Sequence, residues 1–133
     1  MSGKEPQMKT SQLKTACGAA MILGLASTGA IAQTAEPTYK GDPSVYKVIF
    51  EDANFRVIEA NRGPGVKDKA HGHPLPSIVY NVTDCKAKLT AADGKTRESI
   101  TKAGTAAAVP IIASHTAENI GTANCKQIFV EKK

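Results

Sequence analysis

The three histidines of this chain fall in two short segments whose spacing suits metal coordination. His71 and His73 are separated by a single residue. On a β-strand, residues i and i+2 project from the same face, so these two imidazoles would point to a common place. His115 lies farther along, between Gly104 and Asn119. Because imidazole is a common ligand of transition metals, the three histidines are candidates to bind one divalent metal ion.

The residues around the first pair resemble the first sequence motif of the cupin superfamily. That motif is Gly-x5-His-x-His, followed by a glutamate and a glycine. The chain matches it at Gly65, His71 and His73. Ser77 and Ile78 occupy the candidate positions for the glutamate, so the carboxylate is missing, and the closing glycine is absent too.

The residues around the third histidine resemble the second cupin motif, Gly-x5-Pro-x-Gly-x2-His-x3-Asn. The chain matches it at Gly104, Pro110, His115 and Asn119, with Ile112 where the second glycine is usual. The resemblance is closest to small single-domain cupins. It covers about residues 45–131.

The resemblance implies an all-β fold, the cupin-type double-stranded β-helix or jelly-roll barrel, over residues 45–133. Two sheets of such a fold enclose a pocket. Three further residues are candidates for its lining, and each has a simpler alternative. Ser77 would donate a hydrogen bond to a metal-bound water or have no role, Tyr80 would line the pocket or fill the core, and Asn119 would share the pocket face or order a turn.

The missing glutamate implies a metal site of the all-histidine kind. Without a carboxylate, the bound metal keeps one more positive charge. This favours Fe, Zn, Cu or Ni over Mn, and it favours an anionic ligand in an open position. Glu59 and Glu118 are the remaining carboxylates that could substitute. Glu118 lies an odd number of residues from His115, so it is expected to face the other way.

The elements that must position these residues are short β-like segments separated by turn signals. Asp93-Gly94 is typical of a hairpin turn, because glycine supplies the positive φ that such turns require. Regularly spaced strands without a helix predict a sandwich or a barrel. The pattern alone does not choose between an immunoglobulin-like sandwich and a jelly roll. Nine strands are expected, at 46–50, 55–59, around His71 and His73, 77–82, 86–90, 96–102, 105–109, around His115 and Asn119, and at 126–130.

The first 32 residues read as a cleavable signal peptide rather than as part of the fold. Lysines precede an apolar run at 16–25, and the segment ends in Ala30-Ile31-Ala32. The run is shorter than the roughly 20 residues that span a bilayer. An uncleaved anchor is the alternative, and Met8 is an alternative start to Met1. Residues 33–44, rich in Pro, Gly and small polar residues, are expected to be a flexible lead-in.

Charge and cysteine content fit an exported domain. Removing Lys4, Lys9, Lys14 and Glu5 with the leader lowers the formal charge from +5 to about +3. The charges are dispersed, which argues against nucleic acid as a partner. We expect a periplasmic or secreted protein with no membrane contact after cleavage and a small molecule as partner, with a homodimer left open.

Two cysteines, Cys85 and Cys125, remain beyond the leader. The residues alone leave open a disulfide or two unrelated buried thiols. In the strand order that the cupin resemblance implies, the strand beginning at Cys85 and the strand before Cys125 are antiparallel neighbours. The resemblance therefore predicts a Cys85–Cys125 disulfide.

Two function classes follow from these features. The first is a metal-dependent enzyme that acts on a small molecule, such as an oxygenase or an isomerase. The second is a non-catalytic protein that holds a metal or a small ligand. Fold alone does not decide between them.

Overall fold

The computed structural model describes residues 34–133, so the predicted leader lies outside the described residues. No helix in this described part is long and apolar enough to cross a membrane. The described chain contains one short helical turn and nine strands. These are α1 (Thr38–Gly41), β1 (Tyr46–Glu51), β2 (Phe55–Arg62), β3 (His71–His73), β4 (Ser77–Asn81), β5 (Cys85–Ala91), β6 (Thr96–Thr101), β7 (Ala106–Val109), β8 (Ile112–Asn119) and β9 (Cys125–Lys132).

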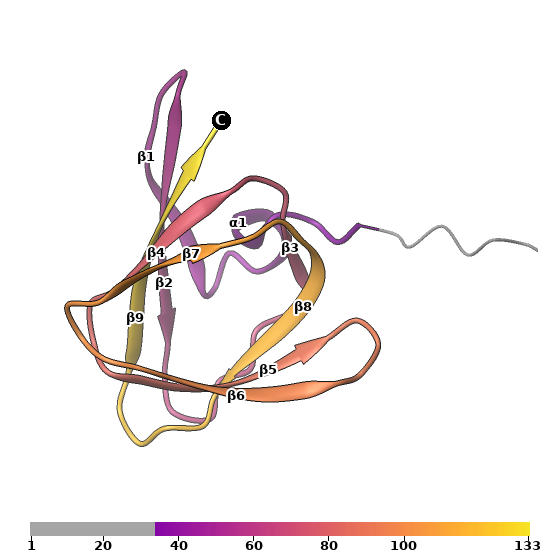
Figure 1. Ribbon diagram of the computed structural model, residues 1–133, viewed down its shortest axis with the longest axis vertical. Helices are drawn as coiled ribbons and strands as arrows, with labels where there is room; N and C mark the ends of the chain where they lie inside the picture. The colour runs from indigo at the N-terminus through magenta and orange to yellow at the C-terminus, as the bar shows by residue number, and fades with distance from the viewer. Residues whose placement is uncertain (1–33) are drawn as a thin grey trace, which may run out of the picture. The chain divides into compact units, whose positions relative to one another are not determined.

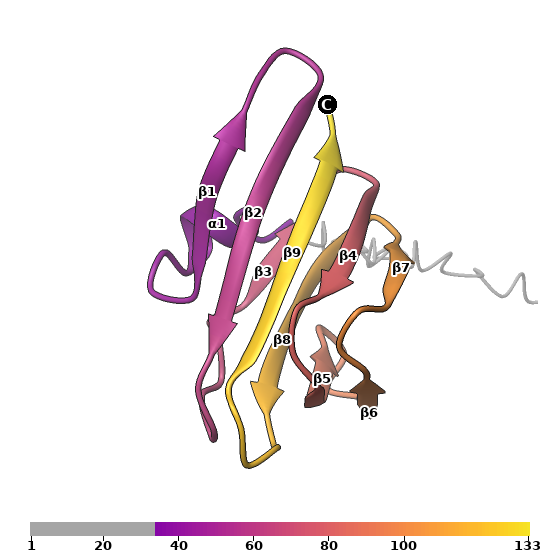
Figure 2. The same ribbon diagram turned by 90° about the vertical axis from the view of Figure 1, so that its left-hand side faces the viewer.

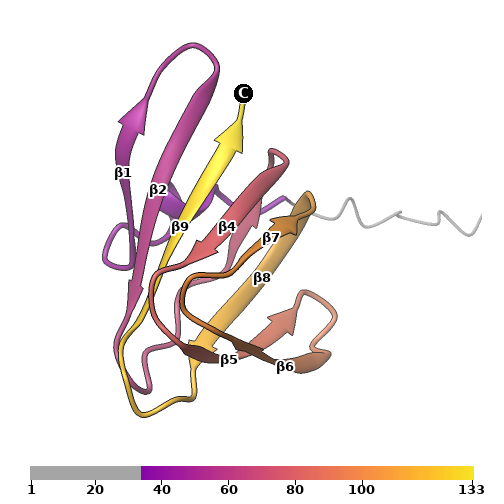
Figure 3. The same cartoon turned by 60° about the vertical axis from the view of Figure 1, so that its left-hand side comes forward.

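The strands form two antiparallel sheets that face each other (Figure 1). The five-stranded sheet has the order β1-β2-β9-β4-β7 and is seen face-on in Figure 2. The four-stranded sheet has the order β3-β8-β5-β6, and Figure 3 shows its β5–β6 hairpin below β4 and β7. Neighbouring strands are often distant in sequence, as in the pairs β2–β9 and β5–β8. The expected all-β jelly roll is confirmed.

The core lies on the inner face of the five-stranded sheet. Ile58, Phe129 and Val79 are cross-strand partners on β2, β9 and β4, so they form one apolar row across the sheet. Burying a side chain of this size contributes about 1.5–3 kcal/mol. The core cluster consists of Val45, Tyr46, Ile58, Ala60, Val79 and Phe129.

Strand β2 runs farther than the sequence indicates. The strand expected at 55–59 continues to Arg62, because Asn61 and Arg62 still pair with Lys126 and Cys125 on β9. Backbone pairing to β9 thus outweighs the turn preference of these two polar residues. As a result the side chain of Arg62 is directed inward and is only 3% exposed.

The lead-in is packed rather than flexible over residues 34–44. The amide of Ala35 donates to the carbonyl of Ala113, and the amide of Gly72 donates to the carbonyl of Glu36. The carboxylate of Asp42 accepts from the backbone amide of Lys69. Composition predicted flexibility because proline and glycine disfavour regular structure, but here the segment bonds to the edge of β3. It therefore helps to fix the segment that carries two of the histidines.

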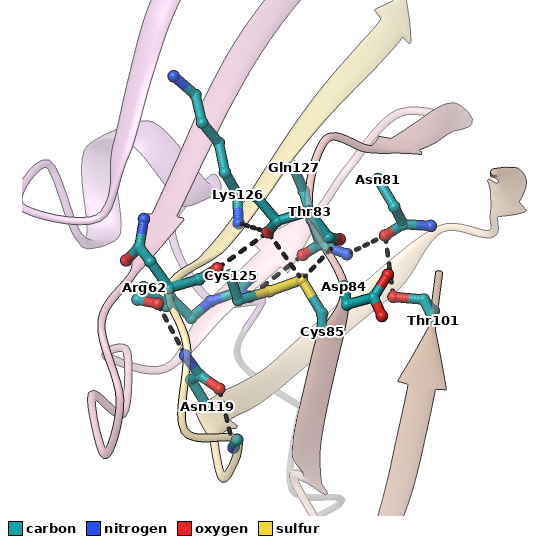
Figure 4. The surroundings of a disulfide bond; sticks show 12 residues. Arg62, Asn81, Thr83, Asp84, Cys85, Thr101, Asn119, Cys125, Lys126 and Gln127 are labelled. Atoms are coloured by element: carbon teal, nitrogen blue, oxygen red, sulfur yellow. Dashed lines mark hydrogen bonds between the residues drawn. A yellow bond between two sulfur atoms is a disulfide. The ribbon is translucent and has the colours of Figure 1, made fainter. Parts of the chain in front are cut away.

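A disulfide joins the two sheets. Cys85 begins β5, Cys125 begins β9, and their Cα atoms are 5.0 Å apart. Figure 4 shows the bridge beside Thr83, whose hydroxyl accepts from the amide of Lys126 and donates to the carbonyl of Asn124. The predicted pairing is confirmed.

Reducing the disulfide is expected to destabilise the fold by about 3–4 kcal/mol, on a chain-entropy estimate for the loop it closes. The two cysteines are 40 residues apart, so the cross-link removes many conformations from the unfolded chain. Urea unfolding of the Cys85→Ser/Cys125→Ser variant measures this loss. Thiol labelling of the denatured, unreduced wild type should find both cysteines blocked, and two reactive thiols would rule the bridge out.

Candidate metal centre

The three histidines come from two paired strands of the four-stranded sheet. β3 pairs with β8 in antiparallel register, with His71 opposite His115 and His73 opposite Ile112. The register shifts between the two histidines of β3, and both of their side chains are buried. The structure therefore brings together all three histidines predicted from the sequence.

Gly72, between the two β3 histidines, is required by close backbone approach. A Cβ atom at this position would lie 2.8 Å from the carbonyl oxygen of Ala113 and 3.1 Å from that of Ala35. The backbones of the lead-in and of β8 thus lie close to Gly72 on both sides of β3. The motif glycines Gly65 and Gly104 serve differently, because each adopts a positive φ in a turn.

The hydrogen bonds of His71 leave one of its ring nitrogens available. Its Nδ1 lies 2.8 Å from the carbonyl oxygen of Lys69, and since a carbonyl only accepts, Nδ1 carries the proton. The Tyr46 hydroxyl is 3.3 Å from Nε2 of the same ring but 2.6 Å from Asp68, so its single proton is donated to the carboxylate. The lone pair of His71 Nε2 is therefore free for a ligand.

The arrangement fits a metal ion. Nε2 of His73 and Nε2 of His115 are 3.0 Å apart, and the ligand atoms of the three histidines all lie within 4.8 Å of one another. Metal–imidazole bonds are about 2.0–2.1 Å long, so two nitrogens at this separation can reach one ion together. The backbone acceptor behind His71 is the kind of outer partner that orients metal-bound histidines.

A buried polar network supports His71 from behind. Asp68 accepts hydrogen bonds from the Tyr46 hydroxyl, from Nε of Arg62 at 3.2 Å and from the backbone amide of Ala117. One of its oxygens lies 3.7 Å from Nδ1 of His71. Sequence reasoning missed this network, because its members come from three separate segments. The one feature in the sequence that could have indicated the network is the position of Asp68, three residues before His71.

All three imidazoles are held neutral by their surroundings. Burial lowers the pKa of His71, while nearby Asp68 opposes the shift. Burial, followed by the neighbouring His115 and His71, lowers the pKa of His73 to about 3. Burial and then His71 lower the pKa of His115 to about 4. Because metal ions bind neutral imidazole, protons should compete with a metal here only in acid.

The metal-free protein is expected to lose stability as the pH falls from about 6.5 towards about 4. The unfolded chain protonates His73 and His115 near their ordinary pKa of 6.5, whereas the folded chain does so only near pH 3 to 4. Stability is therefore fully present above pH 6.5 and falls with acid, by up to about 1.4 kcal/mol per pH unit for each imidazole. Urea unfolding across this range measures the slope. The His115→Gln variant should show a shallower slope, and an unchanged slope would contradict this assignment.

A cavity of about 290 Å³ lies beside the histidines, between the two sheets. His73 and His115 line it, together with Phe129 and Arg62. The ring of His73 lies 5.5 Å from that of Phe129. Two of the three candidate ligands are thus accessible to a small molecule inside the barrel.

The three other pocket candidates do not line this cavity. Tyr80 is 46% exposed on the outer face of the five-stranded sheet, so its expected place in the pocket or core is wrong. Asn119 orders a turn instead: its amide donates to the carbonyls of Arg62 and Ala123, and its Oδ1 accepts from the amide of Gly121. Ser77 is buried but lies outside the lining, and its hydroxyl has no hydrogen-bond partner within residues 34–133.

The two alternative carboxylates also lie away from the cavity. Glu118 forms an ion pair with Lys88, as its odd spacing from His115 predicts, and Glu59 forms one with Lys126. Neither is part of the cavity lining. Within the described part of the chain, the candidate site therefore consists of histidines alone.

Comparison with known proteins identifies the fold. No known family model matches this sequence, and no curated protein matches it either. Among solved structures, a cupin domain from Bordetella pertussis superposes with a TM-score of 0.62 at 20% identity, covering 74% of this chain and 96% of that one. A Klebsiella pneumoniae protein with a double-stranded β-helix domain gives a TM-score of 0.53 at 20% identity, covering 74% and 83%. An oxalate decarboxylase structure gives 0.51 at 23% identity, with 67% of this chain covering 26% of that protein.

The chain therefore has the cupin fold. The resemblance seen in its sequence motifs is confirmed at this level, and the three-histidine cluster is present in the structure. These identities are too low to transfer an activity, so function must be argued from the site.

Proposed function

We propose that this protein is a metal-binding cupin-fold protein whose three-histidine site acts on a small molecule in the interior of the barrel. One observation carries the proposal: the ligand atoms of three imidazoles lie within 4.8 Å of one another, and two of these imidazoles line a cavity of about 290 Å³. Fe, Zn, Cu or Ni suits an all-nitrogen ligand set.

Different residues of the chain would bind the metal, orient its ligands and exclude water. His71, His73 and His115 would hold the ion, and the carbonyl of Lys69 would fix the ring of His71. A bound ion of this kind supplies Lewis acidity or, for iron and copper, redox chemistry. Phe129 and the other apolar lining residues would keep bulk water from the substrate.

Of the two reaction classes, an oxygenase-type reaction fits the cavity better than an isomerisation. An isomerase moves a proton and needs a general base near the substrate. The two histidines in the cavity lining are assigned to the metal, and burial raises the pKa of Tyr46, which also lines the cavity. No aspartate or glutamate is among the lining residues, within the part of the chain that the structure describes. The same scarcity of proton-transfer groups favours a non-catalytic metal- or ligand-binding protein as the second candidate.

We also propose that the protein is exported, to the periplasm or outside the cell, after removal of residues 1–32. The disulfide is compatible with an oxidising compartment, because such bonds rarely persist where thiols are kept reduced.

Reconstitution with iron separates the two candidates. Protein loaded with Fe²⁺ should consume dioxygen in the presence of a panel of small organic substrates, and the His73→Ala variant should not. Stoichiometric metal binding without dioxygen uptake would support the non-catalytic candidate. Failure to retain any transition metal would reject the proposed function.

A further inference from the structure

The charged residues that line the cavity are all cations. They are two arginines, Arg62 and Arg97, while the two histidines of the lining are neutral. The lining includes no aspartate or glutamate among the residues that the structure describes. An interior of this kind raises the local concentration of anions and repels cations.

The two arginines differ in whether another residue balances their positive charge. Arg62 is buried and forms an ion pair with Asp68, and it also donates to the Gln127 side chain and to the Tyr46 hydroxyl. Arg97 is exposed and makes no ion pair or side-chain hydrogen bond with any residue from 34 to 133. Within the described residues, the guanidinium of Arg97 therefore has no protein counter-charge and can pair with an anion in the cavity.

The register of the sheet directs Arg97 towards the metal site. On β6, Arg97 pairs with Leu89 of β5, which in turn pairs with Ala117 of β8. Two residues farther along these strands, on the same face of the sheet, Ala91 of β5 pairs with His115 of β8. Neighbouring strands are about 4.8 Å apart, so the backbone of Arg97 lies about 10 Å across the sheet from β8. Arg97 and His115 therefore belong to the same sheet, and both line the cavity.

The part of the opposite wall that β4 and β7 form is apolar. Val79 of β4 and Ala107 and Val109 of β7 face the stripe that Arg97 and Ser99 form on β6. A ligand that fills this space therefore meets a cation at one wall and aliphatic groups at the other. At about 290 Å³, the cavity is near the lower end of the range typical of small-molecule sites.

We propose that Arg97 selects an anionic substrate, a small carboxylate with an apolar body. The carboxylate pairs with the Arg97 guanidinium, and the body lies against Val79 and Val109, next to the histidines. Guanidinium and carboxylate match in geometry and can form two parallel hydrogen bonds. This inference rests on the proposed function, because it names the substrate class of the same site.

The test compares carboxylates with their neutral amides of the same shape. Benzoate and benzamide, and isobutyrate and isobutyramide, are titrated into metal-free and zinc-loaded protein by calorimetry. In the wild type, at least one carboxylate should bind about tenfold more tightly than its amide. In Arg97→Gln this ratio should fall to about one, and Arg97→Lys should retain part of it. Lys86→Gln, which removes the same charge from the outer face of β5, should leave the ratio unchanged.

The outcomes separate this inference from the proposed function. An unchanged ratio in Arg97→Gln, no preference in the wild type, or binding of no probe at all would overturn the role of Arg97, even if zinc binds stoichiometrically. An Arg97-dependent preference in protein that retains no metal would support anion selection and reject the proposed metal-dependent activity. Circular dichroism of each variant confirms that the fold is retained.

Discussion

Asp68→Ala is expected to lower the free energy of unfolding by about 3–5 kcal/mol, the typical cost of leaving one member of a buried ion pair uncompensated. Asp68 and Arg62 are each only 3% exposed. Without the carboxylate, the Arg62 guanidinium would remain buried without a counter-charge. The Tyr46 hydroxyl and the amide of Ala117 would also lose their acceptor. Urea unfolding at neutral pH measures the change.

A matched control comes from an ion pair at the surface. Glu98 pairs with Lys86, and both side chains are about half exposed. Glu98→Ala removes the same charge, but it should cost less than about 1 kcal/mol, because water already solvates Lys86. The double variant Arg62→Met/Asp68→Leu should recover much of the lost stability, since it removes both buried charges together. Equal losses in Asp68→Ala and Glu98→Ala would show that the buried pair does not support the fold.

Each single change of His71, His73 or His115 to alanine is expected to reduce metal content to near background. Two imidazoles are too few to hold a transition ion against water and competing buffers, whereas three can form a stable face of ligands. The fold should persist, because the disulfide and the apolar row on the five-stranded sheet lie outside this cluster. Elemental analysis of the purified variants, with circular dichroism, checks both expectations.

Asn119→Ala separates metal binding from general destabilisation. Asn119 is fully buried and holds the turn between β8 and β9, so its loss should reduce stability. The hydrogen bonds of its side chain within residues 34–133 go to Arg62, Gly121 and Ala123 and to none of the histidines, so the variant should still bind metal. Retention of full metal by His115→Ala would show that the three-histidine assignment is wrong.

The histidine cluster was predictable from the sequence because its two parts obey simple spacing. His71 and His73 share a strand face through the two-residue period, and the second motif placed His115 on a paired strand. The nine strands followed from the turn signals between them. The disulfide followed from the strand order that the resemblance implied.

The pocket lining was harder to predict, because a lining residue must lie both on the inner face of its strand and close enough to the histidines along it. Ser77 and Tyr80 are three residues apart on β4, so alternation places them on opposite faces. Asn119 has the right parity, but four residues along β8 carry it about 13 Å beyond His115. The network of Tyr46, Arg62 and Asp68 depends on pairings between separate segments, which a single sequence does not reveal.

The central claim, that His71, His73 and His115 form one metal site, is tested most directly by metal stoichiometry. Chelator-stripped protein is loaded with excess Zn²⁺, desalted, and analysed for zinc and protein. The geometry predicts one tightly held ion per chain, and none in the triple variant His71→Ala/His73→Ala/His115→Ala. Zinc content at background in the folded wild type, or equal content in the wild type and the triple variant, would contradict it.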